Sequence, residues 1–124
     1  MAGRVYEMSG TTTRHNQIVF NVLRRLDSLV PLTPYRVYFI DIKIRAANDR
    51  VYYPDVVVVC LAHTQDAVMF DSPCFIVEVT SRSTRRTDRV EKLDAYLKLP
   101  SLHGYLVIEQ DCRHATLYQR ESAE

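Results

Sequence analysis

The spacing of apolar residues along the chain predicts two amphipathic helices. The first stripe recurs every three or four residues, the repeat of a helix with one buried face, and consists of Ile18, Val22, Leu26 and Leu29. We expect this helix over residues 14–30, capped by the preceding run of threonines and ended by Pro31. A second helix is expected over residues 86–98. Its apolar stripe consists of Val90, Leu93 and Leu97.

Alternating and continuous apolar runs predict the strands. Residues 36–46 alternate between two faces, and the turn at Asn48-Asp49 leads into an apolar run over residues 51–60, so a hairpin is expected. Residues 61–73 read as a loop. Further strands are expected over residues 74–80, 105–108 and 115–118. This order of elements predicts an α/β fold, with a mixed β-sheet flanked by helices.

The size and charge of the chain exclude several classes of protein. The 124 residues are enough for one domain, spanning 1–124, and an apolar content of 47% is ordinary for a globular protein. A net charge of +1 argues against a strongly basic platform for nucleic acid. No apolar run is long enough to cross a bilayer, and the start does not have the order of a signal peptide. We therefore expect no membrane partner and a cytoplasmic location.

The three cysteines give no pattern of a disulfide framework or a zinc site. Cys60, Cys74 and Cys112 are odd in number and widely spaced, and the first two lie in apolar runs. We expect buried, reduced thiols, which also fits a cytoplasmic protein.

Two of the predicted strands each carry one carboxylate within an apolar run. Asp55 follows Pro54 at the start of one strand, and Glu78 lies near the end of another, between Val77 and Val79. Burying an ionised carboxylate is costly unless another group compensates for it. Two carboxylates about 4 Å apart would repel each other by roughly 4 kcal/mol at an effective dielectric constant of 20. The pair therefore predicts a shared proton, a cationic side chain or a metal ion.

The candidate groups around these acids are a hard cation and one lysine. Oxygen-only ligands favour Mg²⁺ or Mn²⁺, and the backbone carbonyl of Val79 lies beside Glu78 to complete such a set. Lys92 lies on the helix that follows the Glu78 strand, at the border of its apolar stripe. Asp88, Lys92 and Tyr96 are spaced at i, i+4 and i+8, so they are expected to stack along one face of that helix.

An ordered series of short motifs resembles the Uma family of restriction-endonuclease-like proteins, within the PD-(D/E)XK nuclease superfamily. It begins with residues 3–10 and His15-Asn16-Gln17-Ile18, and continues with Tyr53-Pro54-Asp55-Val56-Val57-Val58 and Ile76-Val77-Glu78-Val79-Thr80-Ser81. Ser83-Thr84, Asp88, Lys92, Tyr96 and Leu99-Pro100-Ser101-Leu102 follow in the same order. The resemblance covers nearly the whole chain and implies a bacterial protein with a restriction-endonuclease-like fold.

The resemblance also implies a divalent-metal-dependent phosphodiesterase. Asp55, Glu78 and the Val79 carbonyl would hold the metal, which would polarise the scissile phosphate and activate a water. In the superfamily a lysine lies two residues after the glutamate, but here that position is Thr80. The resemblance implies that the Uma family supplies this lysine from the next helix instead, at the position of Lys92. They also carry a longer segment before the first motif, so the N-terminal segment of this chain is expected to be truncated or lost.

Each candidate residue also has a structural interpretation. Asp55 could cap local backbone N–H groups at a turn, and Glu78 could form a structural ion pair with Lys92 or an arginine. A lysine on a helix is usually solvated. His15 shares the apolar stripe of the first helix and could act near the site or only bond a carboxylate. Asp41 could be a third acid near the site or an exposed strand residue.

Four arginines follow the Glu78 strand. They are expected to contact a phosphate backbone or to form a solvated helix start, and they are Arg82, Arg85, Arg86 and Arg89. Cations at a helix N-terminus oppose the helix dipole, so helix stability does not explain them.

Two functions follow from these residues. The first is a magnesium-dependent endonuclease acting on DNA, with Asp55, Glu78 and Lys92 as catalytic residues. The second is a catalytically inactive nuclease-fold module for DNA binding or assembly, which the substitution at Thr80 keeps open. The motifs of other hydrolases are absent from the sequence. Because cutting both strands takes two sites, a homodimer is expected for duplex DNA.

Overall fold

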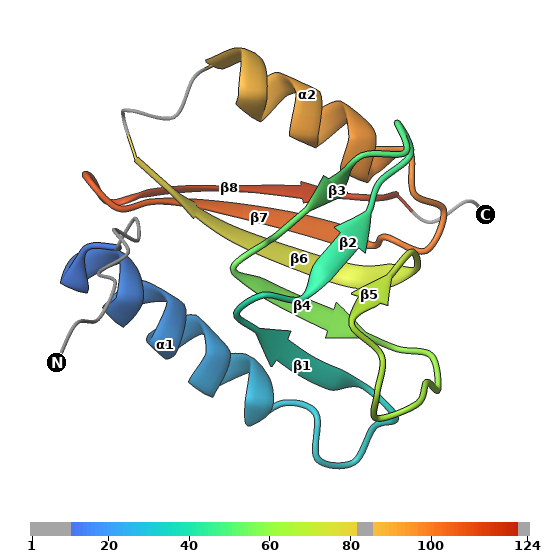
Figure 1. Cartoon of the computed structure of the whole chain (residues 1–124). Coiled ribbons are helices and arrows are strands. Elements are labelled where there is room, and N and C mark those ends of the chain that lie inside the picture. The colour runs from blue at the N-terminus through green and yellow to red at the C-terminus, as the bar shows by residue number, and fades with distance from the viewer. Residues whose placement is uncertain (1–10, 82–85, 122–124) are drawn as a thin grey trace, which may run out of the picture.

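The computed structural model describes residues 11–81 and 86–121, which form two helices and eight strands (Figure 1). The helices are α1 (Thr13–Asp27) and α2 (Arg86–Leu97). The strands of the larger sheet are β1 (Arg36–Phe39), β4 (Val56–Val59), β6 (Pro73–Thr80), β7 (Gly104–Glu109) and β8 (His114–Gln119). Those of the smaller sheet are β2 (Lys43–Arg45), β3 (Val51–Tyr52) and β5 (Met69–Phe70).

The larger sheet has the strand order β1-β4-β6-β7-β8 and is mixed, as predicted. All neighbouring strands in it are antiparallel except β6 and β7, which are parallel. The connection between these two strands passes through α2, because parallel neighbours need a crossover. The two strands next to the predicted acids, β4 and β6, are neighbours in the interior of the sheet.

The two helices lie on opposite sides of the five-stranded sheet (Figure 1). On the α2 side, alternate residues of β4 and β6 pack with residues of the helix. This core includes Val57, Val59, Ile76, Ala95 and Tyr96. On the other side, α1 contacts β1, β4 and β6 through a half-buried stripe, and none of its residues is fully buried. The main cluster of buried residues therefore lies under α2, on the side to which Glu78 points, while Val56 and Val77 are fully buried on the α1 face.

The predicted single strand over residues 36–46 is wrong, because the chain passes from one sheet to the other in its middle. Ile40 and Asp41 have φ angles of 50° and 61°, in the left-handed region that a β-branched residue rarely adopts. They end β1, and β2 begins at Lys43 in the smaller sheet. The partner run over residues 51–60 is divided in the same way, into β3 and β4. The turn between the two runs is confirmed, since β2 and β3 form an antiparallel hairpin.

The helices differ from prediction in their ends and in the buried face of α2. α1 ends at Asp27, three residues before the expected end, with Thr12 as its N-cap. In α2 the buried residues are Ala95 and Tyr96, whereas Val90 is 57% exposed. The sheet therefore contacts a face of α2 next to the aliphatic stripe, and Tyr96 is the main anchor because its ring packs against the rings of Tyr52 and Tyr105.

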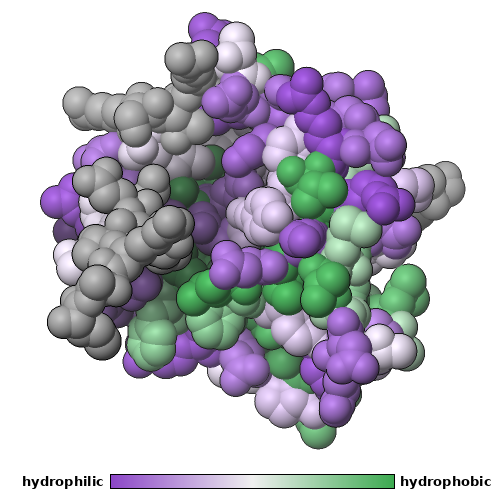
Figure 2. All heavy atoms as spheres, viewed as in Figure 1, coloured by the Kyte–Doolittle hydropathy of each residue, from purple (hydrophilic) through white to green (hydrophobic). Residues whose placement is uncertain are grey.

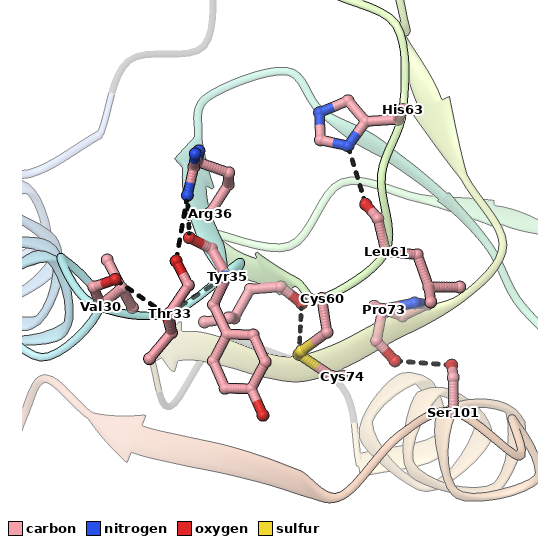
Figure 3. The surroundings of a disulfide bond; sticks show 11 residues. Val30, Thr33, Tyr35, Arg36, Cys60, Leu61, His63, Pro73, Cys74 and Ser101 are labelled. Carbon is pink, nitrogen blue, oxygen red and sulfur yellow. Dashed lines mark hydrogen bonds between the residues drawn. A yellow bond between two sulfur atoms is a disulfide. The ribbon is translucent and has the colours of Figure 1, made fainter.

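The expectation of reduced, buried thiols is wrong, because Cys60 and Cys74 form a disulfide (Figure 3). The antiparallel strands β4 and β6 bring the two ends of the intervening segment together. Their Cα atoms lie 6.1 Å apart, which is within the range of about 4.4–6.8 Å that disulfides bridge. The same segment was predicted to be a loop, yet it contains β5, which pairs in parallel with β2. Cys112 is exposed and donates its S–H to Glu109 Oε2 over 3.1 Å.

Hydrophobic residues reach the surface in several places among hydrophilic ones (Figure 2). The large exposed residues on the described part of the chain include Phe20, Phe39, Ile40 and Tyr53. Within residues 11–81 and 86–121, neither helix has the length and apolar character needed to cross a bilayer.

Candidate functional site

Asp55 and Glu78 lie at the same end of the β4–β6 pair. The antiparallel register pairs Val56 with Val77 and Val57 with Ile76. Asp55 immediately precedes β4 and Glu78 lies near the end of β6, so this register brings both residues to one end of the pair. Their carboxylates point differently there, because Asp55 bonds a backbone N–H of β6 and lines a cavity on the α1 side, whereas Glu78 bonds Lys92 of α2. The two acids that the sequence places on separate strands are therefore neighbours at one end of the sheet.

Asp55 is held by a backbone N–H and by a histidine from α1. The Val79 N–H donates to Asp55 Oδ2 over 2.7 Å, and His15 Nε2 lies 3.3 Å from the same oxygen. The N–H and C=O groups of one residue leave an extended strand on the same side. The carbonyl of Val79 therefore also leaves β6 on the side of Asp55, past the end of β4.

Glu78 is held by two side chains in a much drier environment. Its side chain is 9% exposed, accepts a hydrogen bond of 2.8 Å from the Tyr105 hydroxyl at Oε2, and has Lys92 Nζ 3.5 Å from Oε1. Burial raises the pKa of Glu78 above its ordinary value, and the nearby Lys92 and Tyr105 partly oppose that rise. The carboxylate is therefore compensated by one cation and one neutral donor.

Lys92 reaches the site from α2, at the border between the core and the solvent. Its side chain is 31% exposed, and its ammonium also lies 5.9 Å from the centre of the Tyr52 ring. The helix thus supplies the cation that Thr80 does not. Asp88, which was expected on the same face, is exposed in the first turn of α2, so it does not share the environment of the buried Tyr96.

Two tyrosines next to Glu78 were not singled out as site residues from the sequence. Burial and the charge of Glu78 raise the pKa values of Tyr96 and Tyr105 far above their ordinary range, so both remain neutral donors. The Tyr105 hydroxyl donates to Glu78, whereas the buried Tyr96 hydroxyl lies within electrostatic reach of Glu78 but has no partner at hydrogen-bond geometry among the described residues. Tyr105 lies on the strand that pairs with β6, so only the strand order could have revealed it.

The predicted neighbours of the site fall in two places. His15 and Asp41 line a cavity of about 510 Å³ together with Asp55 and the exposed Tyr53. Thr80 lies on the other side of the site, under α2, and its buried hydroxyl has no hydrogen-bond partner in the described part of the chain. Asp41 is thus near Asp55, on the α1 side of the sheet.

Two of the four predicted arginines can be placed. Arg86 and Arg89 lie in the first turns of α2, and Arg89 forms an ion pair of 3.6 Å with Glu109. Arg82 and Arg85 lie outside the described residues. A role of this group in binding phosphate stays a prediction.

The donor set at the end of the strands fits one hard cation. Within the described ranges, no group of three or more histidine, cysteine, aspartate or glutamate side chains is placed to hold a metal. The candidate set is instead the two carboxylates of Asp55 and Glu78 with the Val79 carbonyl, and oxygen ligands of this kind are those that Mg²⁺ prefers when water fills its other positions. Each carboxylate can accept more hydrogen bonds or ligands than it uses here.

Comparison with known proteins gives the family of the chain. All of residues 1–124 match the Uma2 family, described as "putative restriction endonuclease". The chain belongs to the Uma2 family. The fold agrees, because a crystal structure described as "a putative nuclease belonging to DUF820" from Anabaena variabilis matches 99% of this chain and 76% of that one, with a TM-score of 0.70 and 16% identity. The restriction-endonuclease-like fold is thereby confirmed.

Two relatives of this chain come from Synechocystis sp. and are named uncharacterized proteins. One is 31% identical over 95% of this chain, and the other is 29% identical over 95% of it. The chain spans 69% and 63% of the lengths of these two relatives.

Proposed function

We propose that this Uma2-family chain is a magnesium- or manganese-dependent endonuclease that hydrolyses phosphodiester bonds in DNA. One observation carries the proposal. Asp55 and Glu78 lie at the same end of two adjacent strands, and the ammonium of Lys92 lies 3.5 Å from Glu78. Two carboxylates and one lysine are the groups that metal-assisted phosphodiester hydrolysis needs.

Three groups are proposed to hold the cation: the carboxylates of Asp55 and Glu78 and the carbonyl of Val79. A bound divalent cation would polarise the scissile phosphate and lower the pKa of an attacking water. The Val79 N–H fixes the orientation of Asp55, and the Tyr105 hydroxyl fixes that of Glu78. The chain thus holds both acids in place before a ligand arrives.

Lys92 is proposed as the group that stabilises charge on the transferring phosphate. Its partial exposure leaves the ammonium accessible from solvent while its position beside Glu78 keeps it at the site. A fixed cation in a site of low dielectric stabilises developing negative charge more strongly than the same cation in water. His15, which contacts Asp55 and not Glu78, is proposed as a positioning residue.

The family description supports DNA as the substrate, and the cations at the start of α2 support binding of a phosphate backbone. We propose that two copies act together on duplex DNA, because one site cuts one strand. Linear products from circular DNA would indicate paired cuts, whereas nicked circles would indicate single ones.

A second candidate is a nuclease-fold module that binds or assembles without cutting. It is favoured by the pairing of each acid with groups of the protein, since Lys92 and Tyr105 already compensate Glu78. In that case the ion pair would be structural and the cation unnecessary.

The deciding experiment is cleavage of supercoiled plasmid DNA with and without Mg²⁺. We expect cleavage by the wild type that a chelator abolishes. Glu78→Gln and Lys92→Met should each reduce the rate at least ~100-fold, the scale seen when one group that stabilises transition-state charge is removed. Glu121→Gln is the matched control, because Glu121 is exposed and outside the site. Equal residual nicking by the wild type and Glu78→Gln would exclude the endonuclease activity and favour the nuclease-fold module that binds without cutting.

A further inference from the structure

A cleft between α2 and the β7–β8 hairpin adjoins the carboxylate site. It has a volume of about 260 Å³ and opens beside the start of α2. Its walls are formed by residues from β6, α2, β7 and β8, and the residues that matter here are Thr80, Arg86, Arg89, Tyr105, Glu109 and His114. Pockets for drug-sized ligands start at about 300 Å³, so this cleft suits a smaller unit.

The strongest indication of a ligand is Thr80. This residue is 8% exposed, and its buried hydroxyl has no hydrogen-bond partner among the described residues, 11–81 and 86–121. A buried hydroxyl without a partner destabilises the fold, and such groups are uncommon in native proteins. Thr80 lines the cleft two residues after Glu78, so a polar atom of a ligand in the cleft could supply the missing partner.

The charges of the cleft favour an anion. Arg86 and Arg89 line the cleft and are exposed, and they are opposed by the single carboxylate of Glu109, which pairs with Arg89 over 3.6 Å. His114 lies on the same wall, on β8. With His114 neutral, these side chains sum to one positive charge. Arginine is also the side chain best suited to bidentate binding of phosphate.

The rest of the lining is apolar and leads to the acids. Val90, Leu93 and Val107 provide apolar wall, and the ring of Tyr118 stacks on that of Tyr105. Tyr105 lines the cleft and donates its hydroxyl to Glu78 over 2.8 Å. Only Tyr105 would therefore lie between a ligand in the cleft and the carboxylate of Glu78. Two arginines that suit an anion, a buried hydroxyl and an apolar wall together match one nucleotide.

We propose that this cleft binds a single nucleotide of the nucleic-acid strand next to the one that is cut. Its phosphate contacts Arg86 and Arg89, its base lies against the apolar wall, and a polar atom bonds the Thr80 hydroxyl. This inference rests on the proposed function, because it makes the cleft a subsite of that nuclease. The negative charge of Glu109 repels the phosphate and limits the affinity. The ion pair between Glu109 and Arg89 must break when Arg89 binds the phosphate.

The test is calorimetric titration of the protein with thymidine 5′-monophosphate in the presence of a chelator. Thymidine and inorganic phosphate, titrated separately, divide the ligand into its two parts. We expect the monophosphate to bind at least tenfold more tightly than either part. Arg86→Gln should weaken it by about tenfold, because a hydrogen bond to a charged group is lost. Arg113→Gln is the control, since Arg113 is exposed and outside this cleft.

Two further variants should change the affinity for the monophosphate in opposite directions, which a merely structural role of these residues would not produce. Thr80→Val keeps the shape of the side chain but removes the buried hydroxyl, so it should raise the melting temperature while weakening the monophosphate several-fold. Glu109→Gln removes the opposing charge and should tighten binding about threefold, as expected for a modest charge effect near the surface.

Three results would overturn the inference. They are equal affinity for phosphate and the monophosphate, Thr80→Val binding as well as the wild type, or Glu109→Gln binding more weakly. Because the titration excludes metal and needs no cleavage, its failure is separate from that of the nuclease proposal. If the protein binds the nucleotide but never cuts DNA, the proposed nucleotide-binding cleft is supported and the proposed nuclease activity is contradicted.

Discussion

The two ends of the β4–β6 strand pair are held in opposite ways. At one end Cys60 and Cys74 are joined by a covalent bond, and at the other lie the two acids Asp55 and Glu78. Disulfides stabilise mainly by limiting the unfolded chain, whereas neighbouring carboxylates cost energy in the folded state. The acidic end is therefore the one that depends on compensating groups, which supports our proposal that a cation binds there.

Asp55 and Glu78 also differ in their exposure and in the groups that hold them. Asp55 has a side chain that is 26% exposed and is bonded by a backbone N–H, while Glu78 is 9% exposed and depends on Lys92 and Tyr105. Paired carboxylates in unlike environments tend to take different roles. Glu78 is the member whose charge the fold must support, so changes around it should have the larger energetic effects.

Removal of the disulfide should have the largest effect on stability. The double variant Cys60→Ala/Cys74→Ala opens the loop between two cysteines 14 positions apart, which corresponds to about 3 kcal/mol. Denaturant unfolding of the variant and the wild type measures the difference, with Cys112→Ala as the control. Plasmid cleavage at low temperature should be retained, because the acidic end keeps its contacts. A variant with full stability would show that the pairing of the strands alone fixes this end.

Tyr105→Phe should give the next largest effect. It removes the hydrogen bond to the buried Glu78 and should cost about 1.5–3 kcal/mol, the range for bonds to charged groups. The measurement is again unfolding in denaturant, with Tyr118→Phe as the control because that ring stacks on Tyr105. If both variants lose the same stability, Glu78 does not depend on the Tyr105 hydroxyl.

Asp55→Asn should cost less, about 1 kcal/mol or below, because the amide oxygen still accepts the Val79 N–H. Asp55→Ala removes the acceptor as well and should cost more. Thermal unfolding of the two variants separates loss of charge from loss of the bond. Equal losses would mean that the charge facing His15, and not the bond to Val79, holds this end of the strand.

The smallest expected effect is the contribution of Glu78 to the pH dependence of the free energy of unfolding. Burial raises its pKa above the ordinary value of 4.5, so the folded state holds this proton more tightly than the unfolded state. Its contribution to stability is therefore greatest below about pH 4.5, and it falls as the pH rises through the raised pKa. Glu78→Gln should remove this decline, whereas Glu121→Gln should keep it. Parallel pH profiles for wild type and Glu78→Gln would contradict a raised pKa.

Local patterns predicted the class of fold and the pair of acids, but not how their surroundings are built. Apolar runs identify β4 and β6, and the rule for parallel crossovers gives α2 between β6 and β7. The break at Ile40 and Asp41 violates local preference, so alternation alone continues the strand through it. The Cys60–Cys74 disulfide depends on register, which spacing does not supply.

The same limit applies to the site. Lys92 was found from its place beside the apolar stripe of α2, and the structure puts it next to Glu78. Thr80 was predicted as a neighbour of the site, but not the burial of its hydroxyl, and Tyr105 was not predicted at all, because both residues belong to apolar strands. Their contribution arises only when β6, β7 and α2 are packed together.

The most direct test of the central claim, that Asp55 and Glu78 form one cation site, is calorimetric titration with Mn²⁺ in the absence of DNA. The wild type should bind one ion, and Asp55→Asn and Glu78→Gln should each abolish that binding, since a single site needs both carboxylates. Lys92→Met should retain it, because removal of the neighbouring cation leaves both ligands in place. Unchanged Mn²⁺ binding by Glu78→Gln, or none by the wild type, would contradict the account.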